Sequence, residues 1–158
     1  MTYEELLIDA DDAGIVVKEK KLNGSDGRAW NNRVAIRRNI PTSVEKSCVL
    51  AEEIGHYYTS SGDITRLGSI ESQKQELKAR LYGYNLKIGL VGIIKAYQYG
   101  CRNRYEMADF LDVTEEYLTE AINCYRSKYG KYVLFDNYTI YFEPYFGVLE
   151  LKSAEVSK

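Results

Sequence analysis

The sequence lacks several features that would assign a chain to a protein class at once. Its longest apolar stretch, residues 88–97, carries Lys95 and is too short to span a bilayer, so we expect no membrane association. The N-terminus has no basic segment followed by an apolar run, so we expect no secretory signal peptide. The three cysteines are odd in number and far apart, which favours free thiols in the cytoplasm over a disulfide framework.

The chain also lacks an excess of charge of one sign. The chain has 21 basic and 23 acidic side chains, a formal net charge of -2. A balance this even gives no electrostatic argument for a polyanionic partner. We therefore expect no direct contact with nucleic acid.

Proline is scarce, and no low-complexity tract, internal repeat or Pro/Gly-rich linker divides the 158 residues. This length suits one domain with its own core, so we expect a single domain over residues 1–158. The periodicity predicts a helix-rich α+β fold with a small sheet. Helices are expected over residues 2–13, 42–59, 70–87, 87–100 and 104–130, the last of them with a hinge near 112–114. Strands are expected over residues 14–22 and 33–40 and on both sides of Asp136-Asn137. Residues 23–32 are expected to form a loop.

The second of these helices carries the most informative pattern. Thr42 and Glu45 form a Thr-x-x-Glu capping box after Pro41, and Gly62 supplies a C-terminal break. Within the helix the chain reads "AEEIGHYYT", and its His56 is the only histidine. Glu52 and His56 are separated by four residues, so their side chains project from one face of the helix.

This stretch suggests a metal site of the kind found in zinc peptidases. Glu52 would take the place of a first histidine ligand, His56 would be a second ligand, and Glu53 would accept a proton from the attacking water. Gly55 between them allows another backbone or a substrate to approach closely. Taken alone, however, two glutamates and a histidine on a helix are more often a solvated face.

A third ligand would have to come from a later helix. Glu76 in "SQKQELKAR" is the candidate, and Glu71 is the nearer competitor. The structural alternative for Glu76 is a surface ion pair with Arg80 at i, i+4. Spacing alone does not choose among these.

The run "VLAEEIGHYYTSSGDI" followed by "QKQELKARLYGY" resembles the ImmA/IrrE family of zinc metallopeptidases. The matching positions are Leu50, Ala51, Glu53, Ile54, Gly55, His56, Tyr57, Glu76, Ala79 and Arg80, and Glu52 is the departure. The resemblance implies a minimal zincin-like α+β fold and one divalent metal held by Glu52, His56 and Glu76. It also implies cleavage of a helix-turn-helix repressor from a phage or mobile element, with Glu53 as the catalytic base.

Glu52 changes the expected chemistry of such a site. With two carboxylates and one imidazole, a divalent site is formally neutral, so the metal would be a weaker Lewis acid than with two imidazoles. The harder ligand set shifts preference from zinc, still the first expectation, towards manganese or iron. The competing hypothesis is a regulator with a degenerate metal site that acts by binding the repressor without cutting it.

Three further features have both a structural and a functional interpretation. Cys48 lies one turn before Glu52 and is interpreted as a small buried residue, although a thiolate ligand is conceivable. Residues 105–122 have the apolar spacing of a helix-turn-helix, but the second helix begins "TEEYLTE", which phosphates would repel. The basic strand "RVAIRRN" is expected to be a solvated sheet edge, or an edge that pairs with an extended peptide.

Overall fold

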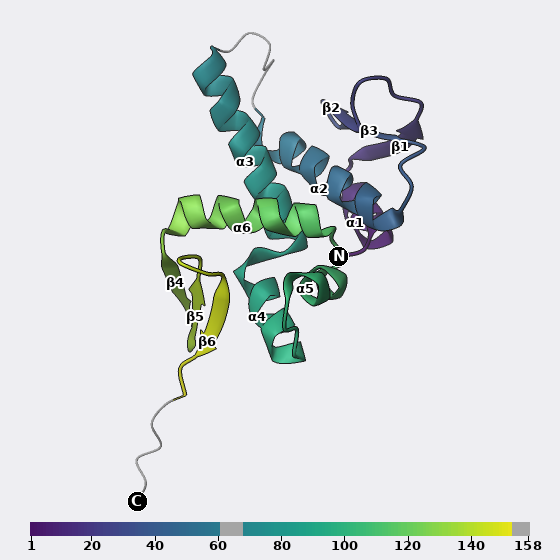
Figure 1. Ribbon diagram of the computed structural model, residues 1–158. Coiled ribbons are helices and arrows are strands. Elements are labelled where there is room, and N and C mark those ends of the chain that lie inside the picture. Colours follow the sequence, from purple (N-terminus) through teal and green to yellow (C-terminus); the bar gives the residue numbers. More distant parts are fainter. Residues whose placement is uncertain (61–67, 153–158) are drawn as a thin grey trace, which may run out of the picture.

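A computed structural model describes residues 1–60 and 68–152, and the expected break at Gly62 lies outside them. The chain is a mixed α+β fold, as the periodicity predicted (Figure 1). The helices are α1 (Tyr3–Asp12), α2 (Ser43–Thr59), α3 (Ser69–Lys87), α4 (Gly89–Tyr99), α5 (Arg104–Leu111) and α6 (Glu115–Tyr129). The strands are β1 (Val16–Lys20), β2 (Gly27–Trp30), β3 (Arg33–Arg37), β4 (Tyr132–Phe135), β5 (Tyr138–Tyr141) and β6 (Gly147–Glu150).

The described chain has two three-stranded sheets where the sequence predicted one small sheet. The first has the order β1-β3-β2, with β1 parallel and β2 antiparallel to β3. The second is the antiparallel sheet β4-β5-β6. Strand β2, which lies in the predicted loop 23–32, and strand β6 were not predicted. Both are four-residue strands, too short for a clear alternation.

The strand order corrects one expectation. The basic strand β3 lies in the centre of its sheet, with β1 on one side and β2 on the other. It is therefore not an edge. Val34 and Ile36 of β3 are buried on the inner face, as is usual for a strand with a neighbour on each side.

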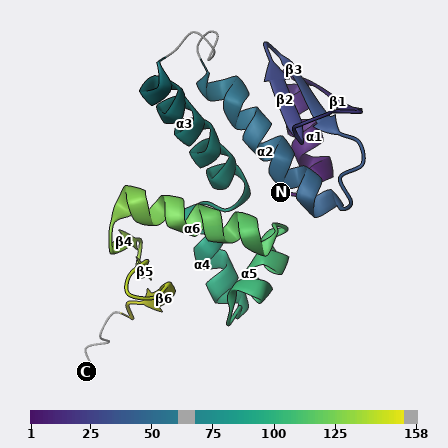
Figure 2. The ribbon, with the colours of Figure 1, turned by 45° about the horizontal axis from the view of Figure 1, so that its top comes forward.

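Helices α2 and α3 form the centre of the molecule. Figure 2 shows them side by side, with the first sheet beyond α2 and α6 crossing near one end of α3. Two hydrophobic clusters meet along this pair. One joins α1 and the first sheet to the buried side of α2, through residues such as Leu6, Ile36 and Leu50. The other joins α4, α5, α6 and the second sheet, through residues such as Ile93, Leu118 and Ile140.

Capping accounts for the helix boundaries. The hydroxyl of Thr42 accepts a hydrogen bond from the backbone N–H of Glu45 at 3.1 Å and starts α2 as predicted. Within the described residues 1–60, the reciprocal bond from the Glu45 side chain, which would complete the predicted capping box, is not formed. Asn103 starts α5 and Thr114 starts α6 in the same way. The hinge between α5 and α6 is confirmed at Asp112, which takes the left-handed conformation with φ 57°.

Candidate metal centre

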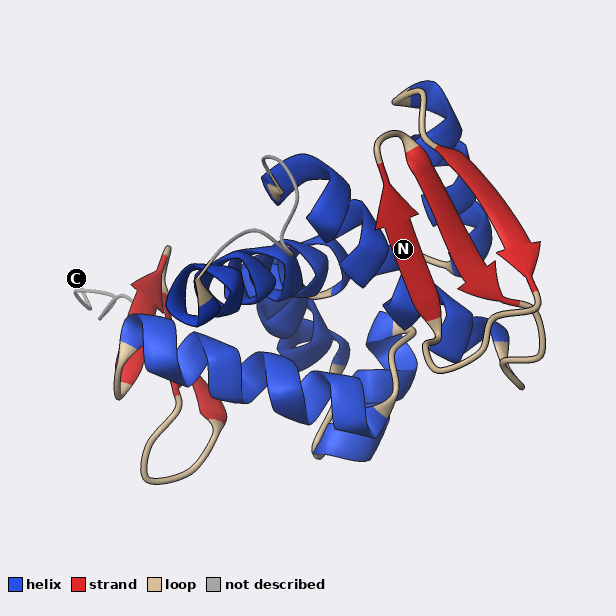
Figure 3. Cartoon of the chain, turned by 90° about the horizontal axis from the view of Figure 1, so that it is seen from above, coloured by secondary structure: helices blue, strands red, loops and turns tan. Residues whose placement is uncertain are grey.

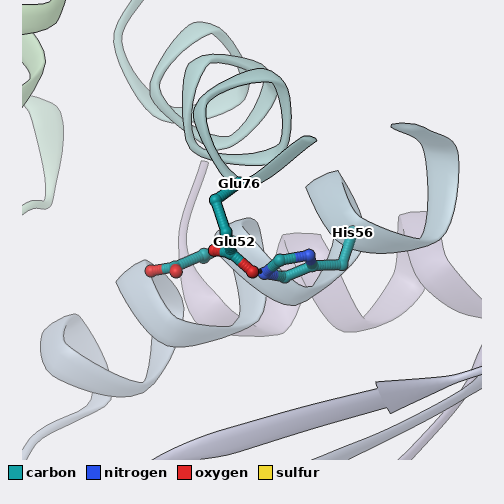
Figure 4. Close-up of side chains that lie close together, drawn as sticks. All are labelled: Glu52, His56 and Glu76. Atoms are coloured by element: carbon teal, nitrogen blue, oxygen red, sulfur yellow. Dashed lines mark ion pairs between the residues drawn. The ribbon is translucent and has the colours of Figure 1, made fainter. Parts of the chain in front are cut away.

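The cluster that the sequence analysis singled out is assembled in three dimensions. One ligand atom from each of Glu52, His56 and Glu76 can be chosen so that all three lie within 4.8 Å of one another. Glu52 and His56 come from α2, and Glu76 reaches across from α3 (Figure 4). The Nε2 atom of His56 lies 3.6 Å from a carboxylate oxygen of Glu76.

The choice between Glu76 and Glu71 is decided by the packing of α3 on α2. Glu71 lies in the exposed first turn of α3 and is not in the cluster, whereas Glu76 is half-buried against His56. The alternative of an ion pair between Glu76 and Arg80 is wrong. Arg80 instead lies with its Nε 3.8 Å from a carboxylate oxygen of Glu52.

Glycines set the distance between the two helices. A Cβ added to Gly55 of α2 would overlap the carbonyl oxygen of Ala79 in α3. On the other helix, a Cβ on Gly83 would lie 3.1 Å from the carbonyl oxygen of Ala51. The close approach expected at Gly55 is therefore that of a second backbone. This contact brings Glu76 within reach of His56.

Glu53 lies on the side of α2 that faces the first sheet. It is 8% exposed, and its Oε1 would be 2.9 Å from a Cβ added to Gly27 of the edge strand β2. Burial, reinforced by the charges of Glu52 and Glu76, raises the pKa of the Glu53 carboxyl to about 8. Burial also raises the pKa of Glu52, although Arg80 and His56 oppose the shift.

An acidic cleft of about 440 Å³ opens beside Glu52, between the first halves of α2 and α6 and the end of β3. Its charged lining is Asp26, Arg37, Glu45, Glu52, Glu116 and Glu120. The single cation, Arg37, is bound to Asp26 at 2.8 Å. Tyr117 also lines the cleft, and its buried hydroxyl has no hydrogen-bond partner in the described part of the chain. The cleft is thus suited to a positively charged side chain.

Cys48, the remaining candidate ligand, lies in the core, and tyrosines of α2 and α3 lie near the contact between these helices. Cys48 is buried in the hydrophobic cluster of α4, α5 and α6, and burial raises the pKa of its thiol, which favours the structural interpretation. Tyr58 stacks on Tyr82 with ring centroids 5.1 Å apart. The hydroxyl of Tyr84 donates to Glu120 at 3.4 Å. The sequence did not predict the contact of Gly27 with Glu53 or that of Arg80 with Glu52, because each joins segments that are distant in the chain.

The three donor groups are of the kinds that bind a small divalent cation. One imidazole nitrogen and two carboxylate oxygens are ligands that zinc, manganese and iron share. The 3.6 Å separation of the His56 and Glu76 donors is close to the spacing of two ligands about 2.1 Å from a common tetrahedral centre. These donor types do not distinguish zinc from manganese or iron.

Comparisons with protein-family models, with curated proteins and with solved structures gave no significant match to this chain. In the described residues, no helix has the length and apolar character needed to cross a membrane.

Proposed function

We propose that this chain is a metal-dependent endopeptidase of the ImmA/IrrE type that cleaves a helix-turn-helix repressor. The observation that carries the proposal is the convergence of Glu52, His56 and Glu76 from two helices, with Glu53 beside them. Such an arrangement supplies three ligands and a base, which is what hydrolysis of a peptide bond at a metal requires.

A divalent cation bound there would polarise the scissile carbonyl and make water a better nucleophile. The proton transfers are assigned to a side chain of the protein. The ionised form of Glu53, which the charge of a bound cation would favour over the protonated form, accepts a proton from the attacking water and passes it to the nitrogen of the leaving amine. One C–N bond then breaks and one C–O bond forms. Because Glu53 is buried under the backbone of Gly27, bulk water has little access to its carboxylate.

Two features support an extended, basic peptide as substrate. Strand β2 is an edge of its sheet, and Gly27 places that edge against Glu53. A peptide that pairs with β2 would therefore lie next to the carboxyl group of Glu53, the proposed base. The acidic cleft beside Glu52 would accept a Lys or Arg side chain of the same peptide. Segments that bind DNA are rich in these residues.

The first test is the metal content of protein purified without chelators or a histidine tag, measured by elemental mass spectrometry. We expect close to one zinc, manganese or iron per chain, lost in His56→Ala and in Glu76→Ala. Glu71→Ala is the matched control, since it removes a carboxylate from the same helix outside the cluster, and it should keep the metal. Wild-type protein that holds no metal after loading with zinc or manganese would contradict the proposal.

A second candidate function is a regulator that binds the repressor without cutting it. The ion pair between Arg80 and Glu52 favours it, because a protein cation already neutralises one proposed ligand. Glu53→Gln separates the two. It should keep partner binding in both cases, but it should abolish inactivation of the repressor only in a peptidase.

A further inference from the structure

The outer face of the first sheet concentrates positive charge that the net charge of the chain conceals. Alternation along the strands points Val34 and Ile36 into the core and places Glu19 on the same inner side. The opposite side chains face outwards. They are Val16, Lys18 and Lys20 of β1, Arg33, Ala35 and Arg37 of β3, and Arg28 and Trp30 of β2.

The strand register arranges these side chains in rows across the sheet. Arg33 lies between Val16 and Trp30, and Ala35 lies between Lys18 and Arg28. Adjacent strands are about 4.8 Å apart, so the cations are close neighbours around a small central residue. Figure 3 shows the three strands side by side at the edge of the molecule. They line a hollow of about 340 Å³.

Most of this charge has no acidic partner. In the described ranges 1–60 and 68–152, ion pairs are found for Arg37 but not for Lys18, Lys20, Arg28 or Arg33. The Arg28 guanidinium donates to the hydroxyl of Ser25 and to the carbonyl of Asn23, neither of which carries charge. The single acidic residue of β1, Glu19, accepts hydrogen bonds on the inner side of the sheet from the hydroxyl of Tyr3 and the ammonium group of Lys46.

An aromatic ring accompanies the cations. Trp30 is 69% exposed, opposite Arg33 at the edge of the sheet. Exposed cations with an aromatic platform are the combination that binds single-stranded nucleic acid, in which phosphates meet the cations and an unpaired base stacks on the ring. An acidic protein surface suits this face less well, since lysines are depleted in protein interfaces and only Trp30, Val16 and Ala35 are apolar here.

We propose that the outer face of the β1-β3-β2 sheet binds single-stranded nucleic acid, with Lys18, Lys20, Arg28 and Arg33 contacting phosphates and Trp30 stacking on a base. This face is on the side of the sheet opposite Glu53, so its binding does not depend on the metal cluster. The rest of the chain carries the compensating negative charge, but salt screens charges beyond about 8 Å at physiological ionic strength.

The only tryptophan of the chain is Trp30, so its fluorescence reports on this face alone. We expect a twelve-nucleotide oligothymidylate, and a uridine oligomer of the same length, to quench it at low salt. With four phosphates neutralised, the logarithm of the binding constant should fall with the logarithm of salt concentration with a slope of about -2.8. His56→Ala should bind equally well.

The matched variants reverse charge on the sheet or away from it. Lys18→Glu together with Arg28→Glu should weaken binding by at least tenfold and reduce the salt slope by about half. Lys95→Glu on α4, also exposed, should change neither. Circular dichroism checks the fold, and Lys18→Gln with Arg28→Gln replaces the double variant if that variant is unfolded.

Four results would overturn the proposal. The first is no quenching by either oligomer at low salt. The second is equal quenching by polyglutamate, which would indicate an acidic protein partner. The third is equal binding of a DNA duplex, in which the bases are already stacked and cannot cover Trp30. The fourth is the same loss of affinity in Lys95→Glu, which would mean that the effect is one of overall charge.

Discussion

Gly55 of α2 lies directly against the carbonyl oxygen of Ala79 in α3, and there is no room for a methyl group between them. The contact is next to one of the two proposed ligands that it brings together and about one turn from the other. His56 follows Gly55, and Glu76 precedes Ala79 by three residues, so the distance between the backbones sets the distance between the donors. The shape of the candidate metal centre thus depends on a residue with no side chain.

Gly55→Ala should therefore damage both stability and the site. The added methyl would push α3 away from α2, and overpacking of this kind destabilises by about 1–3 kcal/mol. Moving α3 also moves Glu76 from His56, so metal content should fall. Thermal unfolding and elemental analysis measure the two effects.

Gly92→Ala in α4 is the control for this change. Its Cβ would lie 3.2 Å from the end of the Leu111 side chain and 4.0 Å from that of Ile88, and alanine is the better helix former. It should leave the metal content unchanged. Equal stability and equal metal content in Gly55→Ala would show that the two helices are not held at this contact.

Glu53 should make the stability of the metal-free protein depend on pH. Its folded pKa, raised from 4.5 to about 8, means that the folded state holds a proton that the unfolded state has lost between these values. The free energy of unfolding should then fall as pH rises from 5 to 8, by roughly 2–4 kcal/mol. Denaturant titrations of chelator-treated protein at several pH values measure this.

In Glu53→Gln this part of the pH dependence should disappear, because an amide does not titrate in the range. The variant should also be the more stable protein at pH 8. A wild type and a Glu53→Gln variant with the same pH profile would argue against a buried carboxyl under Gly27.

Arg80 should compete with a metal for Glu52. Its Nε lies 3.8 Å from the Glu52 carboxylate, and the pair is partly exposed, with interaction energies of about 0.2–1 kcal/mol typical of such pairs. Arg80→Gln should therefore tighten metal binding by about 1.5- to 5-fold. Competition against a chromogenic chelator measures the affinity. Lys78→Gln, a charge loss at an exposed position of the same helix, should have a smaller effect.

Lys87 should be important for stability although it is far from the metal ligands. Its side chain is fully buried, donates to the hydroxyl of Ser47 at 2.8 Å and to the carbonyl of Met1, and lies 3.5 Å from the carboxylate of Asp112. Through these contacts, Lys87 at the end of α3 connects the N-terminus with α2 and with the turn after α5. Lys87→Ala leaves these groups without their donor and should destabilise by roughly 1–3 kcal/mol.

The control for Lys87 is Lys95→Ala. Lys95 is exposed on α4, and changes at such positions usually stay within about 0.5 kcal/mol. Chemical denaturation of the two variants side by side should separate them. Similar unfolding free energies would mean that the buried lysine contributes nothing net.

The amino-acid sequence determined what lies on single helices. It predicted α2 with Thr42 as its cap, the shared face of Glu52 and His56, and the hinge between α5 and α6, and the structure confirms each of these. Local periodicity and capping are enough for such predictions, because the geometry of one helix is nearly fixed.

Tertiary structure alone decided which distant groups meet. The choice of Glu76 over Glu71 and the partner of Arg80 follow from how α3 packs on α2, which depends on contacts such as Gly55 with Ala79. The central position of β3, and with it the charged outer face around Trp30, follows from strand order. A linear sequence records neither, since the packing of helices and the pairing of strands are set by the simultaneous burial of residues far apart in the chain.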